Sequence, residues 1–302
     1  MLVAALVLGT TALWAGTGAA AWQPTKPVEF NVPAGTGGGA DIMARFVAPL
    51  FQKNKIVDKP FIVTNRSGGA GAEGFLHVKG KAGDENTIII TLDNLFTTPL
   101  ATGVPFNWKD LTPISRLALD WFVLWVSADS PYKTAKEYFD AVKKEPGKLK
   151  MGGTGSKQED QIITVQLEQA FGVKWAYVPF KGGGEVAVEL VGKHVDSLAV
   201  IDHERIPLPM WDQIPTLKEA TGTDISYLML RGIFAPPKIK KEVQDGYVDL
   251  FKKVFETEDY QKYLKDYALK GAFLSGADYV KWLEQKEATT RELMDKGGML
   301  KK

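Results

Sequence analysis

The chain repeats one pattern of hydrophobic and polar positions: a short apolar run, a loop rich in glycine, and then an amphipathic stretch. The short runs are typical of buried strands, and the amphipathic stretches are typical of helices that cover a sheet. In the first helix, Ile42, Phe46 and Leu50 recur at helical spacing and predict the face that packs on the core. Strands that alternate with helices predict an α/β fold of parallel sheets with helices on both faces. The predicted strands are 27–33, 61–64, 87–92, 121–126, 148–151, 175–178, 195–201 and 227–235, and the chain from residue 238 onward is predicted to be mainly helical.

Glycine-rich loops stand between the predicted strands and helices at 34–41, 65–71, 152–156 and 179–184. A loop of this kind presents unpaired backbone N–H groups and the positive end of a helix dipole, which together suit a phosphate or a carboxylate. One such loop is weak evidence, because glycine after a strand often serves only the turn. Two loops in each half of the molecule indicate an anion-binding site. Asp41 is placed to cap its helix by accepting from the free amides of the first turn.

Composition narrows the possible functions. A length of 302 residues predicts two lobes, and 45% hydrophobic with 24% charged residues is ordinary for a soluble globular protein. The net charge of +1 without a basic run argues against a nucleic-acid partner. Cysteine is absent, which excludes disulfides and thiol nucleophiles. His77, His194 and His203 do not have metal-ligand spacing, so we expect no metal site.

The first 21 residues carry no charge and end in small residues, which predicts a signal peptide at 1–21 that is cleaved on export. The segment is too short for a stable transmembrane helix, and no cysteine follows it that could carry a lipid anchor. A buried N-terminal helix is the alternative, but nothing in the segment is amphipathic. We therefore expect a soluble protein outside the cytoplasm.

No flexible linker divides the chain, so two lobes would be joined by strands that cross between them. The apolar runs 121–126 and 227–235 are the candidates for these crossings. The predicted first lobe comprises 22–123 and 231–302, and the second comprises 124–230.

Enzymatic motifs are missing. The loop 34–41 lacks the GK[ST] ending of a P-loop, and the dinucleotide pattern GxGxxG fails at Ala40. Ser67 and Ser156 lie in loops, but no histidine has a motif-like relation to either. The adjacent Glu159 and Asp160 are interpreted as a solvated helix face. We expect no enzyme and no cofactor, although an exported α/β enzyme acting on a small anionic substrate remains an alternative.

Aromatic and hydroxyl side chains gather near the glycine loops. The aromatic residues are ordinary core or, alternatively, walls for the carbon skeleton of a ligand; they are Phe96, Trp121, Phe122, Trp125 and Phe180. The hydroxyls offer neutral donors, although each alone more often serves as a cap; they belong to Thr36, Thr97, Thr98, Thr154 and Ser156.

Six segments together resemble one family, the Bug-type extracytoplasmic solute receptors of tripartite tricarboxylate transporters. They are VPAGTGGGADIMAR (32–45), NRSGGAG (65–71), WKDLTPI (108–114), MGGTGS (151–156), PFKGG (179–183) and IPTLKEA (214–220). The resemblance implies a Venus-flytrap fold like that of type II periplasmic binding proteins, with two lobes of mixed, mostly parallel sheet flanked by helices. It further implies a periplasmic monomer that delivers a small carboxylate to the membrane permease subunits.

The resemblance also implies which residues bind the ligand. In the family, the loops that correspond to 34–41 and 152–156 hold carboxylate groups through main-chain amides and hydroxyls, and residues near 94–97 and 180–182 complete the cleft. Asp41 would order its loop, and Lys181 would be a charge partner or a solvated lysine. The expected ligand-binding residues are Ala34, Gly35, Thr36, Gly37, Gly38, Asp41, Asn94, Phe96, Thr97, Thr154, Gly155, Ser156, Phe180, Lys181 and Gly182.

The ligand class stays open between a di- or tricarboxylate and an aromatic carboxylate, because an amide cradle recognises carboxylates generically. A ligand-sensing subunit of a signalling system is a further alternative. The chain also departs from the family after Ser197, where a strand–helix segment that would border the cleft is missing. The second lobe is therefore predicted to be shorter than in the family.

Overall fold

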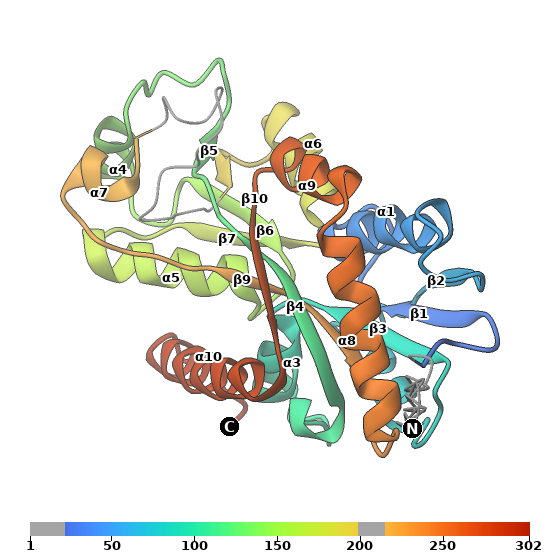
Figure 1. Ribbon diagram of the computed structural model, residues 1–302. Coiled ribbons are helices and arrows are strands. Elements are labelled where there is room, and N and C mark those ends of the chain that lie inside the picture. The colour runs from blue at the N-terminus through green and yellow to red at the C-terminus, as the bar shows by residue number, and fades with distance from the viewer. Residues whose placement is uncertain (1–21, 199–214) are drawn as a thin grey trace, which may run out of the picture.

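The computed structural model describes residues 22–198 and 215–302, which form two β-sheets with helices packed against them (Figure 1). We call the part built on the six-stranded sheet the first lobe and the part built on the four-stranded sheet the second lobe. The first sheet has the order β10-β4-β9-β3-β1-β2, and the second has the order β5-β8-β6-β7. The strands of the first sheet are β1 (Val28–Val32), β2 (Phe61–Asn65), β3 (Thr87–Thr91), β4 (Thr112–Asp120), β9 (Met229–Ala235) and β10 (Leu269–Ser275). Those of the second sheet are β5 (Trp125–Val126), β6 (Lys150–Thr154), β7 (Ala176–Phe180) and β8 (Ser197–Leu198).

Helices cover both faces of the first sheet. One face carries α1 (Gly39–Lys53) and α8 (Lys241–Phe255), and the opposite face carries α3 (Asn94–Thr102) and α10 (Gly276–Lys296) (Figure 1). The remaining helices are α2 (Ala72–Lys79), η1 (Trp108–Asp110) and α9 (Glu258–Asp266) in the first lobe, and α4 (Ala135–Lys144), α5 (Glu159–Phe171), α6 (Gly183–Val191) and α7 (Leu217–Thr221) in the second. This arrangement confirms the predicted α/β fold.

Parallel pairing is limited to the strands that alternate with helices. β1 pairs in parallel with β2 and β3, and β6 pairs in parallel with β7 and β8. By contrast, β9 runs antiparallel to β3 and β4, β10 runs antiparallel to β4, and β5 runs antiparallel to β8. The reason is topological: parallel neighbours need a crossover connection, whereas β9 enters the first sheet from the second lobe. Both sheets are therefore mixed.

The predicted crossings between the lobes are shorter than expected. The run 121–126 forms a strand only at Trp125–Val126, and residues 121–124 have no regular structure. The run 227–235 forms β9 at Met229–Ala235, which lies wholly within the first sheet. The chain thus passes between the lobes through the residues that flank β4 and β9.

The strand β10 was missed by the sequence pattern, which predicted a mainly helical chain in this region. Its sequence, LKGAFLS, neither alternates in polarity nor contains a β-branched residue. It pairs with β4, and the register shifts between Gly271 and Leu274. The tertiary partner therefore determines this strand, rather than the local preference of its residues.

The buried face of α1 is shifted from the predicted one. Of the predicted residues Leu50 is buried, whereas Ile42 and Phe46 are only partly buried at the edge of the core. Met43 and Phe51 are buried instead. Phe51 stacks on Phe61, with ring centroids 3.9 Å apart. Complete burial of such side chains stabilises the fold by about 1.5–3 kcal/mol each, so the residues that face the sheet set the orientation of the helix.

Two predictions from the sequence fall outside the described residues: the signal peptide at 1–21 and most of the shortened segment after Ser197. Within the ranges 22–198 and 215–302, no helix is both long and apolar enough to span a membrane.

Candidate ligand-binding site

The carboxylate of Asp41 holds the first glycine loop in place. Its Oδ2 accepts a hydrogen bond from the Gly37 amide at 2.9 Å, and its Oδ1 accepts from Arg45 Nε and Asn65 Nδ2, each at 2.9 Å. Asn65 also donates to the carbonyl oxygen of Ala34 at 3.0 Å, which closes the other end of the loop. Burial alone would raise the pKa of Asp41, but the bonds from Gly37, Arg45 and Asn65 outweigh it and keep the pKa below its ordinary value. Asp41 is therefore ionised and orders the loop.

The predicted capping role of Asp41 is wrong in detail. The N-cap of α1 is Gly38, which has no side-chain cap, and Asp41 bonds back to the loop instead of to the amides of the first turn. Within the described part of the chain, the amides of Gly39 and Ala40 donate to no acceptor. The start of α1 therefore keeps the unpaired N–H groups and the positive dipole that an anion requires.

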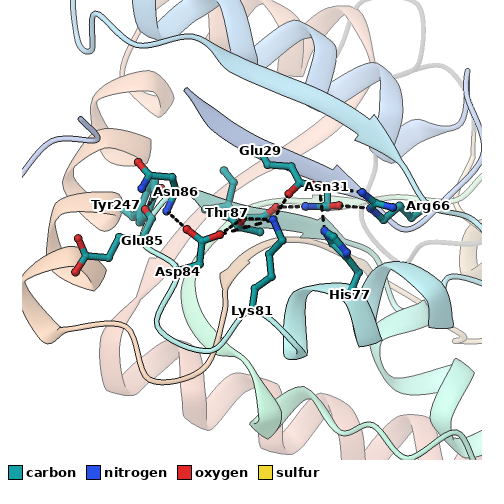
Figure 2. Close-up of polar contacts among 11 residues, drawn as sticks. Glu29, Asn31, Arg66, His77, Lys81, Asp84, Glu85, Asn86, Thr87 and Tyr247 are labelled. Atoms are coloured by element: carbon teal, nitrogen blue, oxygen red, sulfur yellow. Dashed lines mark hydrogen bonds and ion pairs between the residues drawn. The ribbon is translucent and has the colours of Figure 1, made fainter. Parts of the chain in front are cut away.

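The second glycine loop, 65–71, packs against β1 and Pro33, from which the first glycine loop begins, and so supports the first loop. Arg66 donates to Asn31 Oδ1 at 3.1 Å and to Glu29 Oε1 at 3.2 Å, within the polar cluster of Figure 2. A Cβ atom on Gly71 would lie 2.6 Å from the carbonyl oxygen of Pro33, so only glycine permits this approach. Its φ of 93° also lies in the left-handed region. These contacts give the loop a structural role.

The third glycine loop is shorter than predicted, because Gly152 and Gly153 belong to β6. A Cβ atom on Gly152 would lie 2.9 Å from Val186 Cγ1, and one on Gly153 would lie 2.5 Å from Tyr177 Oη. These two glycines therefore allow close packing inside the second lobe instead of flanking a ligand. The signal was ambiguous, because glycine marks both loops and close approaches of the backbone.

Two amides expected to bind the ligand are occupied within the second lobe. The Thr154 amide donates to Asp160 Oδ2 at 2.5 Å, and the Gly155 amide donates to the Phe180 carbonyl oxygen at 2.8 Å. Tyr177 Oη donates to the carbonyl oxygen of Gly155 at 2.9 Å. The expectation that Thr154 and Gly155 hold a carboxylate through their amides therefore fails in this conformation, and Ser156 is left as the candidate donor of the loop.

The glycine loops of the two lobes meet directly. A Cβ atom on Gly182 would lie 3.9 Å from the Cα atom of Gly38, and one on Gly35 would lie 3.8 Å from the carbonyl oxygen of Lys181. The Lys181 amide donates to Glu185 Oε2 at 2.9 Å, and the residue is exposed. This geometry favours the solvated interpretation of Lys181, and it shows that the lobes are closed at this point.

The expected contacts at 94–97 are mainly structural. Asn94 Nδ2 donates to the Pro33 carbonyl oxygen at 3.1 Å, and Asn94 Oδ1 accepts from the Leu92 amide at 3.3 Å, so this side chain ties the ends of β1 and β3 together. Phe96 is 1% exposed and belongs to the hydrophobic core, and Thr97 is fully buried. The interpretation of Phe96 as ordinary core is therefore correct.

The acidic pair Glu159 and Asp160 is not a solvated face, because only 6% and 7% of these residues are exposed. Burial, together with the neighbouring charges of Asp93 and Asp160, raises the pKa of Glu159 to about 8. Burial likewise raises the pKa of Asp160 to about 6 against the opposing hydrogen bonds from Thr154. The prediction failed because it considered only the direction of side chains on an isolated helix.

Asp93 ties the end of β3 to α10 and to the segment that enters β9, and sequence reasoning did not select it. Its Oδ1 accepts from the Leu230 amide at 3.0 Å, and its Oδ2 accepts from Tyr227 Oη at 2.6 Å and forms an ion pair with Lys286 at 2.7 Å. The residue is fully buried. Its position directly after the central strand β3 was the available signal, since polar residues at the carboxyl ends of strands often serve a site.

A second buried ion pair lies beside the start of α1. Arg231 donates from Nε and Nη2 to the two carboxylate oxygens of Asp120, at 2.9 and 2.6 Å. A Cβ atom on Gly39 would lie 2.4 Å from Arg231 Nη2, so the guanidinium lies directly against the first residue of the helix. Neither Asp120 nor Arg231 lies in a sequence motif that indicates a site.

Two mixed sheets with helices packed against them, connected through the residues that flank β4 and β9, define a two-lobed α/β protein of the periplasmic-binding-protein class. The model of the tripartite tricarboxylate transporter family receptor matches residues 43–210, and the chain belongs to this family. It is 28% identical over 297 residues to the UPF0065 protein in the gbd 5'region of Cupriavidus necator, covering 92% of this chain and 89% of that protein.

Solved structures share the fold. R. palustris Rpa4515 with adipate aligns with a TM-score of 0.84 at 20% identity, covering 91% of this chain and 98% of that one. MatC from Rhodopseudomonas palustris with bound malate aligns with a TM-score of 0.78 at 19% identity, covering 90% and 99%. The family and the fold are those of solute-binding receptors.

Proposed function

We propose that this receptor captures a small carboxylate between its lobes and delivers it to the permease subunits of a tripartite tricarboxylate transporter. The observation that carries the proposal is the contact between Gly38 and Gly182, which brings two glycine loops from different lobes together. A carboxylate at the start of α1 would receive hydrogen bonds from unpaired amides and the favourable potential of the helix dipole. The adipate and malate named for the two related structures support the same class of ligand.

The proposed contacts divide into two groups. Residues that would touch the ligand are Ala34, Gly35, Thr36, Gly37, Gly38, Ser156, Phe180 and Gly182. Asp41 and Asn94 would act indirectly, because their side chains fix the backbone of the first loop. Pre-organisation of this kind lowers the entropic cost of binding.

The remaining features of the proposal follow from the family. The receptor would be a monomer in the periplasm, without a cofactor, after removal of residues 1–21. The lobes would comprise 22–123 with 231–302, and 124–230. Each lobe would move as a unit, and a ligand that bridges them would stabilise the closed form.

A thermal melt of the mature protein with a panel of carboxylates tests the proposal. A ligand that binds only the native state raises the melting temperature as its concentration exceeds Kd, since stabilisation grows as RT ln(1 + [L]/Kd). We expect such a shift without consumption of the ligand. Turnover of a small anionic substrate, with no shift for any carboxylate, would show that the chain is an enzyme instead.

A further inference from the structure

A pocket of about 270 Å³ adjoins the start of α1, between that helix, the end of α9 and the segment that leaves β4. It draws residues from both sides of the junction between the lobes: Gly39 and Tyr263 belong to the first lobe, Val123 belongs to the connecting segment, and Trp125 belongs to the edge strand of the second lobe. Gly39 lines the pocket and is also the first residue of α1, so the pocket adjoins the proposed anion site at this helix.

Aromatic rings form much of the pocket wall; they belong to Trp121, Phe122, Trp125, Tyr263 and Tyr267. Trp125 is 45% exposed and Tyr267 is 52% exposed, although large hydrophobic side chains of the described chain are otherwise mostly buried. Exposed apolar surface that gathers around one hollow is typical of a site that a ligand covers.

Charges in the pocket are already compensated. The guanidinium of Arg231 is paired with Asp120 by two hydrogen bonds, and Asp266 at the rim is paired with Lys262. Arg231 is 6% exposed, and its Nη1 has no hydrogen-bond partner within the described residues. The guanidinium lies against Gly39, beside the start of α1.

The volume of the pocket and the charged residues that line it restrict the class of ligand. A cavity of about 150 Å³ is enough to bind benzene, so a pocket of about 270 Å³ holds one aromatic ring with a short substituent. A second carboxylate would enter this pocket without a free countercharge, because the guanidinium of Arg231 is already paired with Asp120, although its Nη1 has no partner within the described residues. The pocket therefore favours an aromatic ring over the distal carboxylate of an aliphatic dicarboxylate.

We propose that the ligand is a monocyclic aromatic monocarboxylate, with its ring in this pocket and its carboxylate at the first turn of α1. This inference rests on the proposed receptor function and names the substrate class of the same site. The ring stacks against Trp121, Trp125 and Tyr267, and binding buries these side chains from water.

Isothermal titration calorimetry of the mature protein tests the inference, with benzoate and phenylacetate as aromatic probes and adipate and malate as aliphatic ones. We expect at least one aromatic probe to bind about tenfold or more tightly than either aliphatic acid, a difference of about 1.4 kcal/mol. Binding should also change the tryptophan fluorescence, because two tryptophans line the pocket.

Two pocket variants locate the ring. Val123→Phe fills the pocket, and Tyr267→Ala removes an exposed wall without creating a cavity in the core. Both should weaken binding of the aromatic acid about tenfold while leaving the melting temperature of the free protein unchanged. Val280→Phe, on the exposed surface of α10, is the matched control and should leave the affinity unchanged.

The outcomes separate the two proposals. Binding of adipate or malate without binding of either aromatic acid would overturn the inference and leave the receptor function standing. Aromatic binding that neither Val123→Phe nor Tyr267→Ala weakens would also overturn it, because the ring would lie elsewhere. If no carboxylate binds, the receptor function fails together with the inference.

Discussion

Gly182 of the second lobe lies against Gly38 of the first, so closely that a Cβ atom on Gly182 would be 3.9 Å from the Cα atom of Gly38. A methyl group at this distance makes an ordinary contact, but any longer side chain would separate the loops. The φ of Gly182 is −175°, an extended conformation that every residue adopts. A small residue at this position is therefore favoured by the approach of the other lobe and not by the local backbone.

Gly182→Leu should block closure while leaving each lobe intact. We expect the melting temperature of the free protein to stay within about 2 °C of the native value, and the affinity for the ligand to fall at least about tenfold. Calorimetry on the ligand found in the carboxylate panel measures the effect. Ala187→Leu, on the exposed face of the same helix, is the control and should bind normally. Native affinity in Gly182→Leu would show that the loops do not need to meet.

Gly39→Ala should destabilise the fold, because its methyl group would collide with the guanidinium of Arg231, which Asp120 holds in place. We expect a loss of about 1–3 kcal/mol in the free energy of unfolding, the usual cost of overpacking. Gly183→Ala is the matched control, because Gly183 is also the first residue of its helix and has open space around it. Urea denaturation compares the two variants, and equal stability would contradict the close approach of Arg231.

The buried Glu159 should make the protein less stable as the pH rises. Its pKa is about 8 in the folded protein against 4.5 ordinarily, so the stability it contributes is complete below pH 4.5 and is lost as the pH rises through 8. The loss in the free energy of unfolding approaches about 5 kcal/mol at high pH. Glu159→Gln should remove most of this decline, as measured by urea denaturation between pH 5 and 9. Asp140→Asn, at an exposed position of α4, should keep the native slope, and the same slope in Glu159→Gln would refute the prediction.

The cluster around Glu29 should stabilise the protein against acid. Its carboxylate pairs with Arg66 at 3.2 Å, with His77 at 3.1 Å and with Lys81 at 2.5 Å (Figure 2). Burial opposes ionisation, but the bonds from Lys81 and Arg66 lower the pKa of Glu29 to about 2. The stability it contributes is therefore present above pH 4.5 and is lost as the pH falls toward 2.

Glu29→Gln should lower the free energy of unfolding at pH 6 by about 3 kcal/mol at most and should flatten its dependence on pH below 4.5. Urea denaturation between pH 2 and 6 measures both effects. Glu292→Gln is the control, because this exposed carboxylate pairs one turn along its helix with Lys296, a solvent-screened pair whose loss should leave stability unchanged. If the free energy of unfolding of Glu29→Gln depends on pH below 4.5 as it does in the native protein, the cluster does not contribute to stability against acid.

The sequence predicted the strand–loop–helix units well, because each of them follows a local pattern. β1, α1 and the loop between them lie where the apolar run, the glycines and the helical spacing placed them. The pattern could not predict β10, since its residues have no strand periodicity and only pairing with β4 makes them a strand. It also placed Gly152 and Gly153 in a loop, because a sequence does not distinguish a glycine in a tightly packed strand from a glycine in a loop.

For the site, the sequence by itself determined the chemistry: glycine-rich loops that end in helix N-termini attract an anion whatever surrounds them, since unpaired amides and a dipole belong to the local backbone. Tertiary structure decided which loops face the other lobe, and it left Gly38 against Gly182 while the 65–71 loop became a support. It also decided the charge of Glu159 and the pairing of Arg231 with Asp120. Burial and distance between remote segments control these properties, and neither is encoded in the spacing of residues along the chain.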